Sequence, residues 1–180
     1  MADAKYDVLG VGNAIFDVLV KTDEAFLASH GMTKGSMALI DEARAASIYR
    51  DMGPATEMSG GSAANTIVGI AGLGARAAFV GKVKDDQIGN MYAHDIRAAG
   101  VAFTTKAASD GPATGCSYIL VTGDGERTMN TYLGAAQNLT PVALSFSSHA
   151  GGRTLAIRTR QTLNLSYPRL LQTPWEWSSC

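Results

Sequence analysis

The sequence predicts an α/β fold in which a mainly parallel sheet is flanked by helices. Short apolar runs alternate with segments of helical spacing, and glycines end most of them, which is the pattern of strand–helix–strand units. The clearest unit runs over 59–89, where a Gly-Gly pair precedes a helix of small residues and a short strand follows. Asp124-Gly125, between two strand-like runs, predicts one antiparallel hairpin.

Length, charge and cysteine content describe an ordinary globular chain. Its 180 residues, of which 46% are hydrophobic, are enough for one α/β domain with a buried core. A net charge of -1 gives no electrostatic reason to expect nucleic acid or a membrane surface as a partner. The polar N-terminal residues do not resemble a secretory signal, and no apolar run reaches membrane-spanning length, so we expect a cytoplasmic protein. Because Cys116, Cys180 and His94 are far apart in the sequence, we predict no disulfide framework and no metal site.

The first two elements are strands over 6–11 and 14–20, and a single charge, Asp17, interrupts the second. A carboxylate inside an apolar strand is costly to bury unless it has a partner, so it either faces solvent or binds something. The glycines before it do not form a dinucleotide-binding fingerprint, because Ile15 takes the place of the third glycine.

The remaining segments follow from helix caps, glycine stops and apolar spacing. In chain order, we predict an apolar run over 37–40, a helix that Asp41 caps and Gly53 ends, a helix that Ser62 caps and that ends at 73–74, a strand over 76–81, a helix that Asp85 or Asp86 caps and Gly100 ends, a strand over 101–105, and a hairpin over 115–134. Successive units of this kind favour parallel strands covered by helices.

The Gly-Gly pair before the central helix is the clearest functional signal. Gly60 and Gly61 remove two side chains at the point where Ser62 can cap the helix, so a ligand can approach the backbone and its free N–H groups closely. Asn65 then lies in the first turn of the helix. A strand-to-helix turn without any ligand also needs glycine, so the pair alone fits both interpretations.

The stretch over 59–89 resembles the first signature of the ribokinase (PfkB) family of carbohydrate and nucleoside kinases. The matching residues are Gly60, Gly61, Ala63, Asn65 and Gly74, whereas Ile67 and Lys84 depart from the usual pattern. The GNAIFD segment at 12–17 and the hairpin extend the likeness, and within the family they are most similar to adenosine kinases. The resemblance implies a ribokinase-like α/β fold, in which a mainly parallel sheet flanked by helices carries a small β lid.

The resemblance also implies a substrate site. In adenosine kinases the matching aspartate accepts hydrogen bonds from the ribose hydroxyls, a task that suits a carboxylate because it can take two vicinal O–H donors. This role falls to Asp17, while Asn13 would help to place the base or sugar. Gly61 and Asn65 would contact the ribose from the helix side.

The region around 37–40 and the hairpin would form the lid over the substrate. Met37 is a candidate for apolar contact with the substrate, and ordinary core packing is the alternative. Arg127 and Asn130 fall near positions where relatives carry residues that face the substrate hydroxyl and the phosphates, and a plain surface arginine is the alternative. The full set of expected substrate-binding residues is Asn13, Asp17, Met37, Gly60, Gly61, Ser62, Asn65, Arg127 and Asn130, with no catalytic residue and no metal ligand assigned.

The character of the sequence changes near residue 144. Residues 145–180 contain four arginines, no lysine and both tryptophans, and two prolines interrupt any helix or strand period. We therefore divide the chain into a substrate-binding part with the lid strands, 1–144, and an atypical tail, 145–180, that is either disordered or translated out of frame.

Phosphoryl transfer needs a held hydroxyl, a proton acceptor, an electropositive site and usually Mg²⁺. Ribokinase relatives place this machinery in a second signature, Asp-Thr-x-Gly-Ala-Gly-Asp, and neither that string nor a P-loop occurs in this sequence. The resemblance thus implies an ATP- and Mg²⁺-dependent kinase of a small-molecule nucleoside or sugar, represented here by a truncated, inactive form. A non-catalytic nucleoside- or sugar-binding module is the alternative, and an incompletely packed fragment without activity is a third interpretation.

Overall fold

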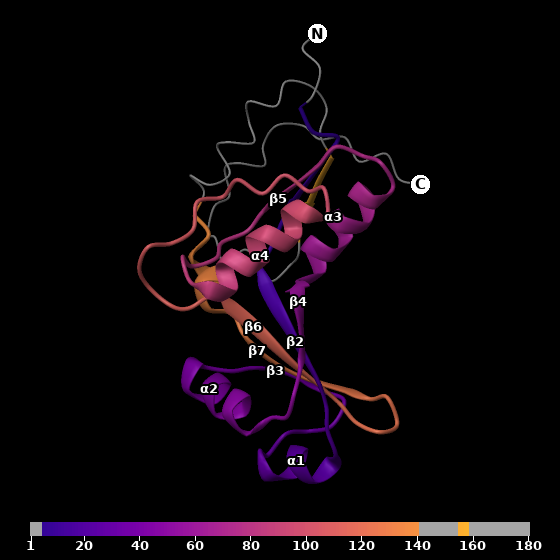
Figure 1. Cartoon of the computed structure of the whole chain (residues 1–180), viewed down its shortest axis with the longest axis vertical. Coiled ribbons are helices and arrows are strands. Elements are labelled where there is room, and N and C mark those ends of the chain that lie inside the picture. Colours follow the sequence, from indigo (N-terminus) through magenta and orange to yellow (C-terminus); the bar gives the residue numbers. More distant parts are fainter. Residues whose placement is uncertain (1–4, 141–154, 159–180) are drawn as a thin grey trace.

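Two β-sheets build the part of the chain that the structure, a computed structural model, describes, residues 5–140 and 155–158. The smaller sheet is parallel and three-stranded, in the order β5–β1–β8, with β1 at Val8–Val11, β5 at Ala77–Val80 and β8 at Leu155–Arg158. Helices α3 (Ser62–Gly72) and α4 (Gln87–Ala98) lie in the same half of the molecule, the upper half in Figure 1.

Helix α3 packs directly on β1 and β5 because a glycine in β1 leaves room for it. A Cβ atom added at Gly10 would lie only 2.3 Å from Cγ1 of Ile67, which is fully buried in α3. The helix that follows the Gly-Gly pair is therefore fixed against the smaller sheet, and this contact gives its first turn a defined position.

The larger sheet is five-stranded and mixed, and we call it the lid sheet. Its order is β3–β7–β6–β2–β4, with β2 at Ile15–Lys21, β3 at Met37–Leu39, β4 at Thr56–Gly60, β6 at Gly115–Val121 and β7 at Arg127–Tyr132. Strands β2 and β6 and strands β3 and β7 pair in parallel, and the other two pairs are antiparallel. Helices α1 (Glu24–Ser29) and α2 (Glu42–Asp51) lie at the lower end of the molecule in Figure 1.

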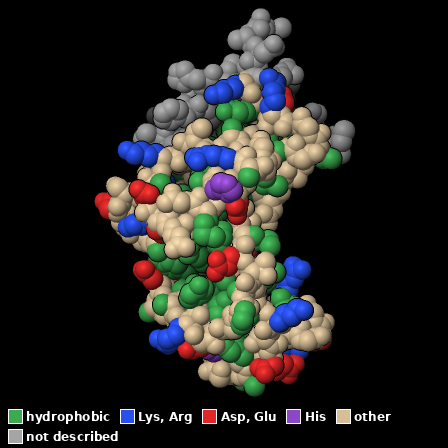
Figure 2. Space-filling model, viewed as in Figure 1, with side chains coloured by type: hydrophobic (Ala, Val, Ile, Leu, Met, Phe, Trp, Pro, Cys, Tyr) green, Lys and Arg blue, Asp and Glu red, His purple; other side chains and the backbone are tan. Residues whose placement is uncertain are grey.

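The two faces of the lid sheet differ in what covers them, because side chains alternate along each strand. Val18 and Val20 of β2 point to the face that we call the outer face and are buried in one cluster with Leu27 of α1 and Ile48 of α2. Asp17 points to the opposite face, which we call the open face. In the view of Figure 2, hydrophobic side chains gather over the strands between α4 and α2.

The chain passes between the two sheets four times: between β1 and β2, between β4 and α3, before β6, and after β7. Ile15, the first residue of β2, pairs with Gly60 on one side and Gly115 on the other, so the crossings form one row at the end of the lid sheet. Two of them touch, because a Cβ atom added at Gly61 would lie 2.6 Å from the carbonyl oxygen of Asn13.

Most of the predicted elements are confirmed to within a residue or two at their ends. The Asp41 side chain caps α2 by accepting from the N–H of Arg44 at 2.8 Å, and Asp86 caps α4 by accepting from the N–H of Gly89 at 2.7 Å. The predicted strand over 76–81 is β5, and the predicted hairpin is β6–β7.

Two predicted features are wrong. Ser62 does not cap α3, because it is the first helical residue and Gly61, with a φ of 97°, takes the cap position. Asp41 and Asp86 cap from extended backbone, whereas a positive φ strains any residue except glycine. Within the described residues, 101–105 form no strand, since Ala102 makes one isolated parallel bridge to β5.

Helix α1, strand β4 and a short 3-10 helix over Gly134–Asn138 were not predicted. Helix α1 is six residues long and begins after Asp23, whose side chain accepts from the N–H of Phe26 at 2.8 Å. Strand β4 pairs antiparallel with β2 and is mostly exposed, so it carries no buried alternation.

The tail over 145–180 remains a prediction for most of its length, because 141–154 and 159–180 lie outside the described residues. Residues 155–158 within it form β8, which pairs in parallel with β1. The sequence analysis predicted no strand there, since a four-residue run is too short to show a period.

Candidate functional site

The central feature of the open face is the carboxylate of Asp17. Strand β2 places it between Met58 of β4 and Ser117 of β6, which are its register partners. The side chain is half-buried, and across residues 5–140 and 155–158 it has neither a hydrogen-bond partner nor an ion pair. Burial raises the pKa of Asp17 from 3.8 to about 6. A partly buried carboxylate without a partner is an acceptor that a ligand can satisfy.

Gly60 provides the space in which this carboxylate lies. A Cβ atom at position 60 would sit 2.1 Å from Oδ2 of Asp17, far inside contact distance. The carbonyl oxygen of Gly60 accepts a hydrogen bond of 3.2 Å from the hydroxyl of Tyr92, a fully buried residue of α4. Burial, and next the charge of Asp17, raise the pKa of Tyr92, so this hydroxyl stays protonated. Tyr92 of α4 therefore fixes the last residue of β4 by this hydrogen bond.

The other predicted residues near the start of α3 lie at the crossing beside Gly60. Gly61 needs its positive φ of 97° and its missing side chain because the carbonyl oxygen of Asn13 lies against it. Ser62 and Asn65 are exposed in the first turn of α3, and the N–H of Asn65 donates to the carbonyl of Gly61 at 2.8 Å. All four residues therefore lie at the crossing end of the lid sheet, next to the strand position that Asp17 occupies.

Exposed apolar side chains lie on the open face at both edges of the lid sheet, and one of them, Met58, is the register neighbour of Asp17. Met37 and Leu39 of the edge strand β3 are 46% and 59% exposed, and Met58 of the opposite edge strand β4 is 45% exposed, which is unusual for large hydrophobic residues. Met37 and Leu39 are on the open face because they pair with Met129 and Thr131 of β7. The face therefore combines one acceptor carboxylate with an apolar surface, as a site for a ligand with both hydroxyls and an apolar ring requires.

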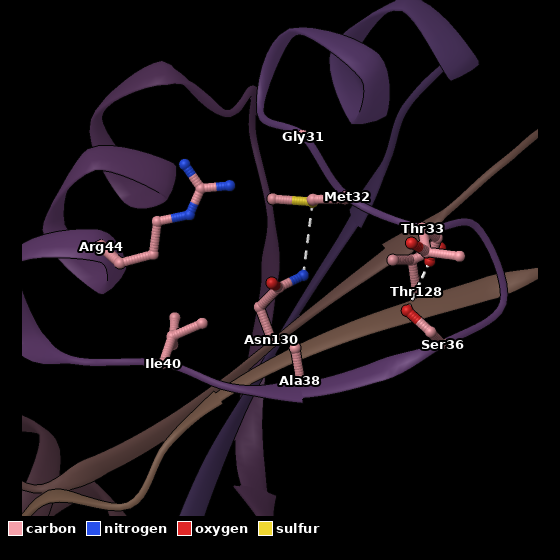
Figure 3. A pocket seen from close by; sticks show the side chains of 9 residues that line it. All are labelled: Gly31, Met32, Thr33, Ser36, Ala38, Ile40, Arg44, Thr128 and Asn130. Atoms are coloured by element: carbon pink, nitrogen blue, oxygen red, sulfur yellow. Dashed lines mark hydrogen bonds between the residues drawn. The ribbon is translucent and has the colours of Figure 1, made fainter.

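The structure separates two residues that the sequence analysis placed together. Arg127 lies on the open face at the far end of β7 and is exposed. Asn130 lies on the outer face, is 4% exposed, and points into a pocket that Figure 3 shows. Asn130 therefore does not join the group around Asp17.

Three residues of the open face were missed. Ser117 of β6 lies beside Asp17 in the register, Thr131 of β7 lies beside Ser117, and the two hydroxyls are 2.8 Å apart. Met129 follows on the same face of β7. The alternation along the predicted hairpin was the signal that could have found them.

The described residues contain no group of three or more His, Cys, Asp or Glu side chains that could hold a metal ion. None of the described helices is long and apolar enough to cross a membrane.

Comparison with known protein families matches residues 45–157 to the description "pfkB family carbohydrate kinase". This match covers well over half of the 180 residues. The chain belongs to the pfkB family. The match also extends past residue 144, where the sequence analysis ended the likeness, and includes β8 almost completely.

Solved structures of adenosine and sugar kinases resemble about four-fifths of this chain. An adenosine kinase from Sinorhizobium meliloti is 56% identical with a TM-score of 0.73, over 78% of this chain and 43% of that one. A probable sugar kinase from Rhizobium etli is 51% identical with a TM-score of 0.73, over 78% and 42%. An adenosine kinase from Schistosoma mansoni in complex with adenosine is 25% identical with a TM-score of 0.68, over 80% and 42%.

Curated relatives of the family match a shorter region. Probable fructokinase-4 of Arabidopsis thaliana is 38% identical over 73 residues, which are 41% of this chain and 22% of the relative. The chain thus spans about a fifth of the length of these curated relatives and less than half of the solved kinases.

Proposed function

We propose that this chain is the acceptor-binding part of an ATP-dependent kinase that phosphorylates the hydroxymethyl group of a nucleoside or sugar, with adenosine as the preferred acceptor. The observation that carries the proposal is the unpartnered Asp17 carboxylate in the space left by Gly60. One ionised carboxylate can accept two vicinal hydroxyls, and the ribose of a nucleoside presents such a pair.

The surroundings of Asp17 favour a nucleoside over a plain sugar. Met58 of β4, the register neighbour of Asp17, offers an exposed apolar side chain that an aromatic base can cover and a free sugar cannot, and Met37 and Leu39 lie at the far edge of the same face. The solved adenosine kinase is also slightly more identical to this chain than the probable sugar kinase is, at 56% against 51% over the same share of the chain. Asn13 and Asn65, at the crossing end, would then place the bound sugar.

In the proposed kinase, the described residues of this chain bind the acceptor and do not bind the phosphoryl donor. They hold and orient the acceptor, and the open face excludes water from it. ATP with Mg²⁺ would supply the phosphoryl group and its charge compensation, but no described residue is assigned to either of them. We therefore propose that the chain by itself binds the acceptor without turning it over, in agreement with the missing Asp-Thr-x-Gly-Ala-Gly-Asp string.

Calorimetric titration of the chain with adenosine, ribose and fructose tests the proposal. We expect adenosine to bind most tightly, and Asp17→Asn to weaken adenosine binding by at least about tenfold. Asp110→Asn is the matched control, because Asp110 is an exposed aspartate away from the site, and it should leave the affinity unchanged. Equal affinity in wild type and Asp17→Asn would refute the proposed role of this carboxylate.

A second assay separates the proposed kinase part from a module that only binds. Adenosine, ATP and Mg²⁺ are incubated with this chain, and AMP is measured by chromatography. Formation of AMP would overturn the proposal that the chain alone does not turn over. If no AMP forms, adding back the missing portion of the solved adenosine kinase, fused after residue 140, should produce it, and a fusion that binds adenosine without any turnover would favour the binding module.

A further inference from the structure

A second site lies on the outer face of the lid sheet, turned away from Asp17. It is a pocket of about 260 Å³ between β3, β7, the first turn of α2 and the segment that follows α1 (Figure 3). The alternation along the strands separates the two sites: Ala38 and Asn130 face the pocket, while Met37 and Thr131 face the open side. The thickness of the sheet therefore lies between this pocket and the proposed acceptor site.

The pocket contains one cation that no acid neutralises. Arg44 comes from the first turn of α2, and its guanidinium extends toward the pocket in Figure 3. One of its nitrogens donates to the carbonyl oxygen of His30, and within the described part of the chain it forms no ion pair with a carboxylate. A guanidinium has five N–H donors, so most of them remain available to a planar anion.

The floor of the pocket holds a buried polar group with an unused acceptor. Asn130 is 4% exposed, and its amide nitrogen donates to the sulfur of Met32 at 3.3 Å. Its amide oxygen accepts from no donor among the described residues, and in Figure 3 it lies on the side of the amide away from Met32, toward Arg44 and Ile40. No described side-chain oxygen is both fully buried and unpaired, so this amide oxygen is accessible from the pocket, where a hydroxyl of a bound molecule can donate to it.

We propose that this pocket binds a small anion that also carries a hydroxyl group, such as a hydroxycarboxylate or a hydroxyalkyl phosphate. Arg44 pairs with the anionic group, and the amide oxygen of Asn130 accepts from the hydroxyl. The volume is slightly below the roughly 300–1,000 Å³ of pockets for drug-sized ligands, so the pocket suits a small solute and is too small for a nucleotide.

Titration calorimetry with three probes tests this proposal on the full chain. L-Malate and succinate differ only in the hydroxyl, and glycerol 3-phosphate replaces the carboxylate by a phosphate. We expect malate or glycerol 3-phosphate to bind at millimolar concentrations or below, and malate to bind more tightly than succinate. Arg44→Gln should lower the affinity for the anion by at least about tenfold. Arg50→Gln, on the exposed side of the same helix, should leave this affinity unchanged.

The variant Asn130→Leu gives an independent reading, because leucine keeps the size of the side chain and removes the amide. It should abolish the preference for malate over succinate, and it decides the matter if Arg44→Gln fails to fold by circular dichroism. No binding of any probe at millimolar concentration, or equal loss in Arg44→Gln and Arg50→Gln, overturns the proposal. Asp17→Asn should leave malate binding intact while it weakens adenosine binding, so failure of this site and failure of the proposed function are distinguishable.

Discussion

Replacing Asp17 by asparagine removes a charge that the folded protein holds at a cost in stability. Burial raises the pKa of this carboxyl from 3.8 to about 6, so its ionised form is less favourable in the folded chain than in the unfolded one. The difference corresponds to about 3 kcal/mol of unfolding free energy before solvent screening. Because the group keeps part of its contact with solvent, we discount this figure to about 1–2 kcal/mol.

The pH dependence of this penalty has a definite sign. Well below pH 3.8 the carboxyl is protonated in both states and costs nothing, whereas well above pH 6 it is ionised in both and the full penalty applies. Wild-type stability should therefore lose about 1–2 kcal/mol from this group as the pH rises from about 4 to about 6. Asp17→Asn should be more stable than wild type by that amount at pH 7 and about equally stable near pH 3.5. Adenosine binding should show the opposite trend, since the acceptor role needs the ionised form.

Urea unfolding followed by circular dichroism at several pH values between 3.5 and 8 measures this difference. The exposed-site control Asp110→Asn should show no comparable dependence on pH. A variant Asp17→Asn that is less stable than wild type at neutral pH, or that gains the same amount at every pH, would refute the reasoning. Such a result would mean that the folded protein gives the carboxylate a partner.

Three further substitutions have expected outcomes. Gly60→Ala places a Cβ atom 2.1 Å from a carboxylate oxygen. It should therefore lower the unfolding free energy in urea by about 1–3 kcal/mol and abolish adenosine binding. The control Gly69→Ala has open space around the new Cβ atom and should raise the unfolding free energy by about 0.5–1 kcal/mol. Asp86→Ala loses three hydrogen bonds, one from the first turn of α4 and two from the residue before β6, and should lower the unfolding free energy by about 2–4 kcal/mol. The control Asp85→Ala, at an exposed position, should change the unfolding free energy by less than about 0.5 kcal/mol. Met37→Ser should leave thermal stability nearly unchanged, because the side chain is exposed, and weaken adenosine binding by about fivefold in calorimetry; unchanged binding would remove this residue from the site.

The parts of the fold that local sequence determines were predictable. Caps such as Asp41 and Asp86 act within one helical turn, and the Asp-Gly hairpin turn acts within four residues, so a single sequence contains the whole signal. Strand β4 lacks such a signal, because its exposed residues gain their place only from pairing with β2. The run over 101–105 shows the reverse case, since Val101 and Phe103 are buried but the backbone between them makes only one bridge.

The candidate site could have been predicted more fully than it was. Arg127 and Asn130 are three positions apart in one strand, and an odd spacing puts their side chains on opposite faces. The same alternation places Met129 and Thr131 with Arg127 on the open face. The close approach of Gly60 to Asp17 could not be predicted, because it depends on the antiparallel register between two strands that are about 40 residues apart.

The crossings between the two sheets lie in a single row, so any rotation of the lid sheet relative to the smaller sheet would take place about this row. A rotation of the lid sheet about this line displaces each residue in proportion to its distance along the strands. Asp17 is two residues beyond Ile15 in β2, which is about 7 Å along the strand. Met37 of β3 lies, by the register across the sheet, at the level of the β2 residue four positions beyond Ile15, which is about 13 Å along the strand. The apolar contact of β3 therefore moves about twice as far as the carboxylate in any such rotation. If the proposed acceptor site is correct, such a rotation would change the apolar end of the site more than the end that holds the carboxylate.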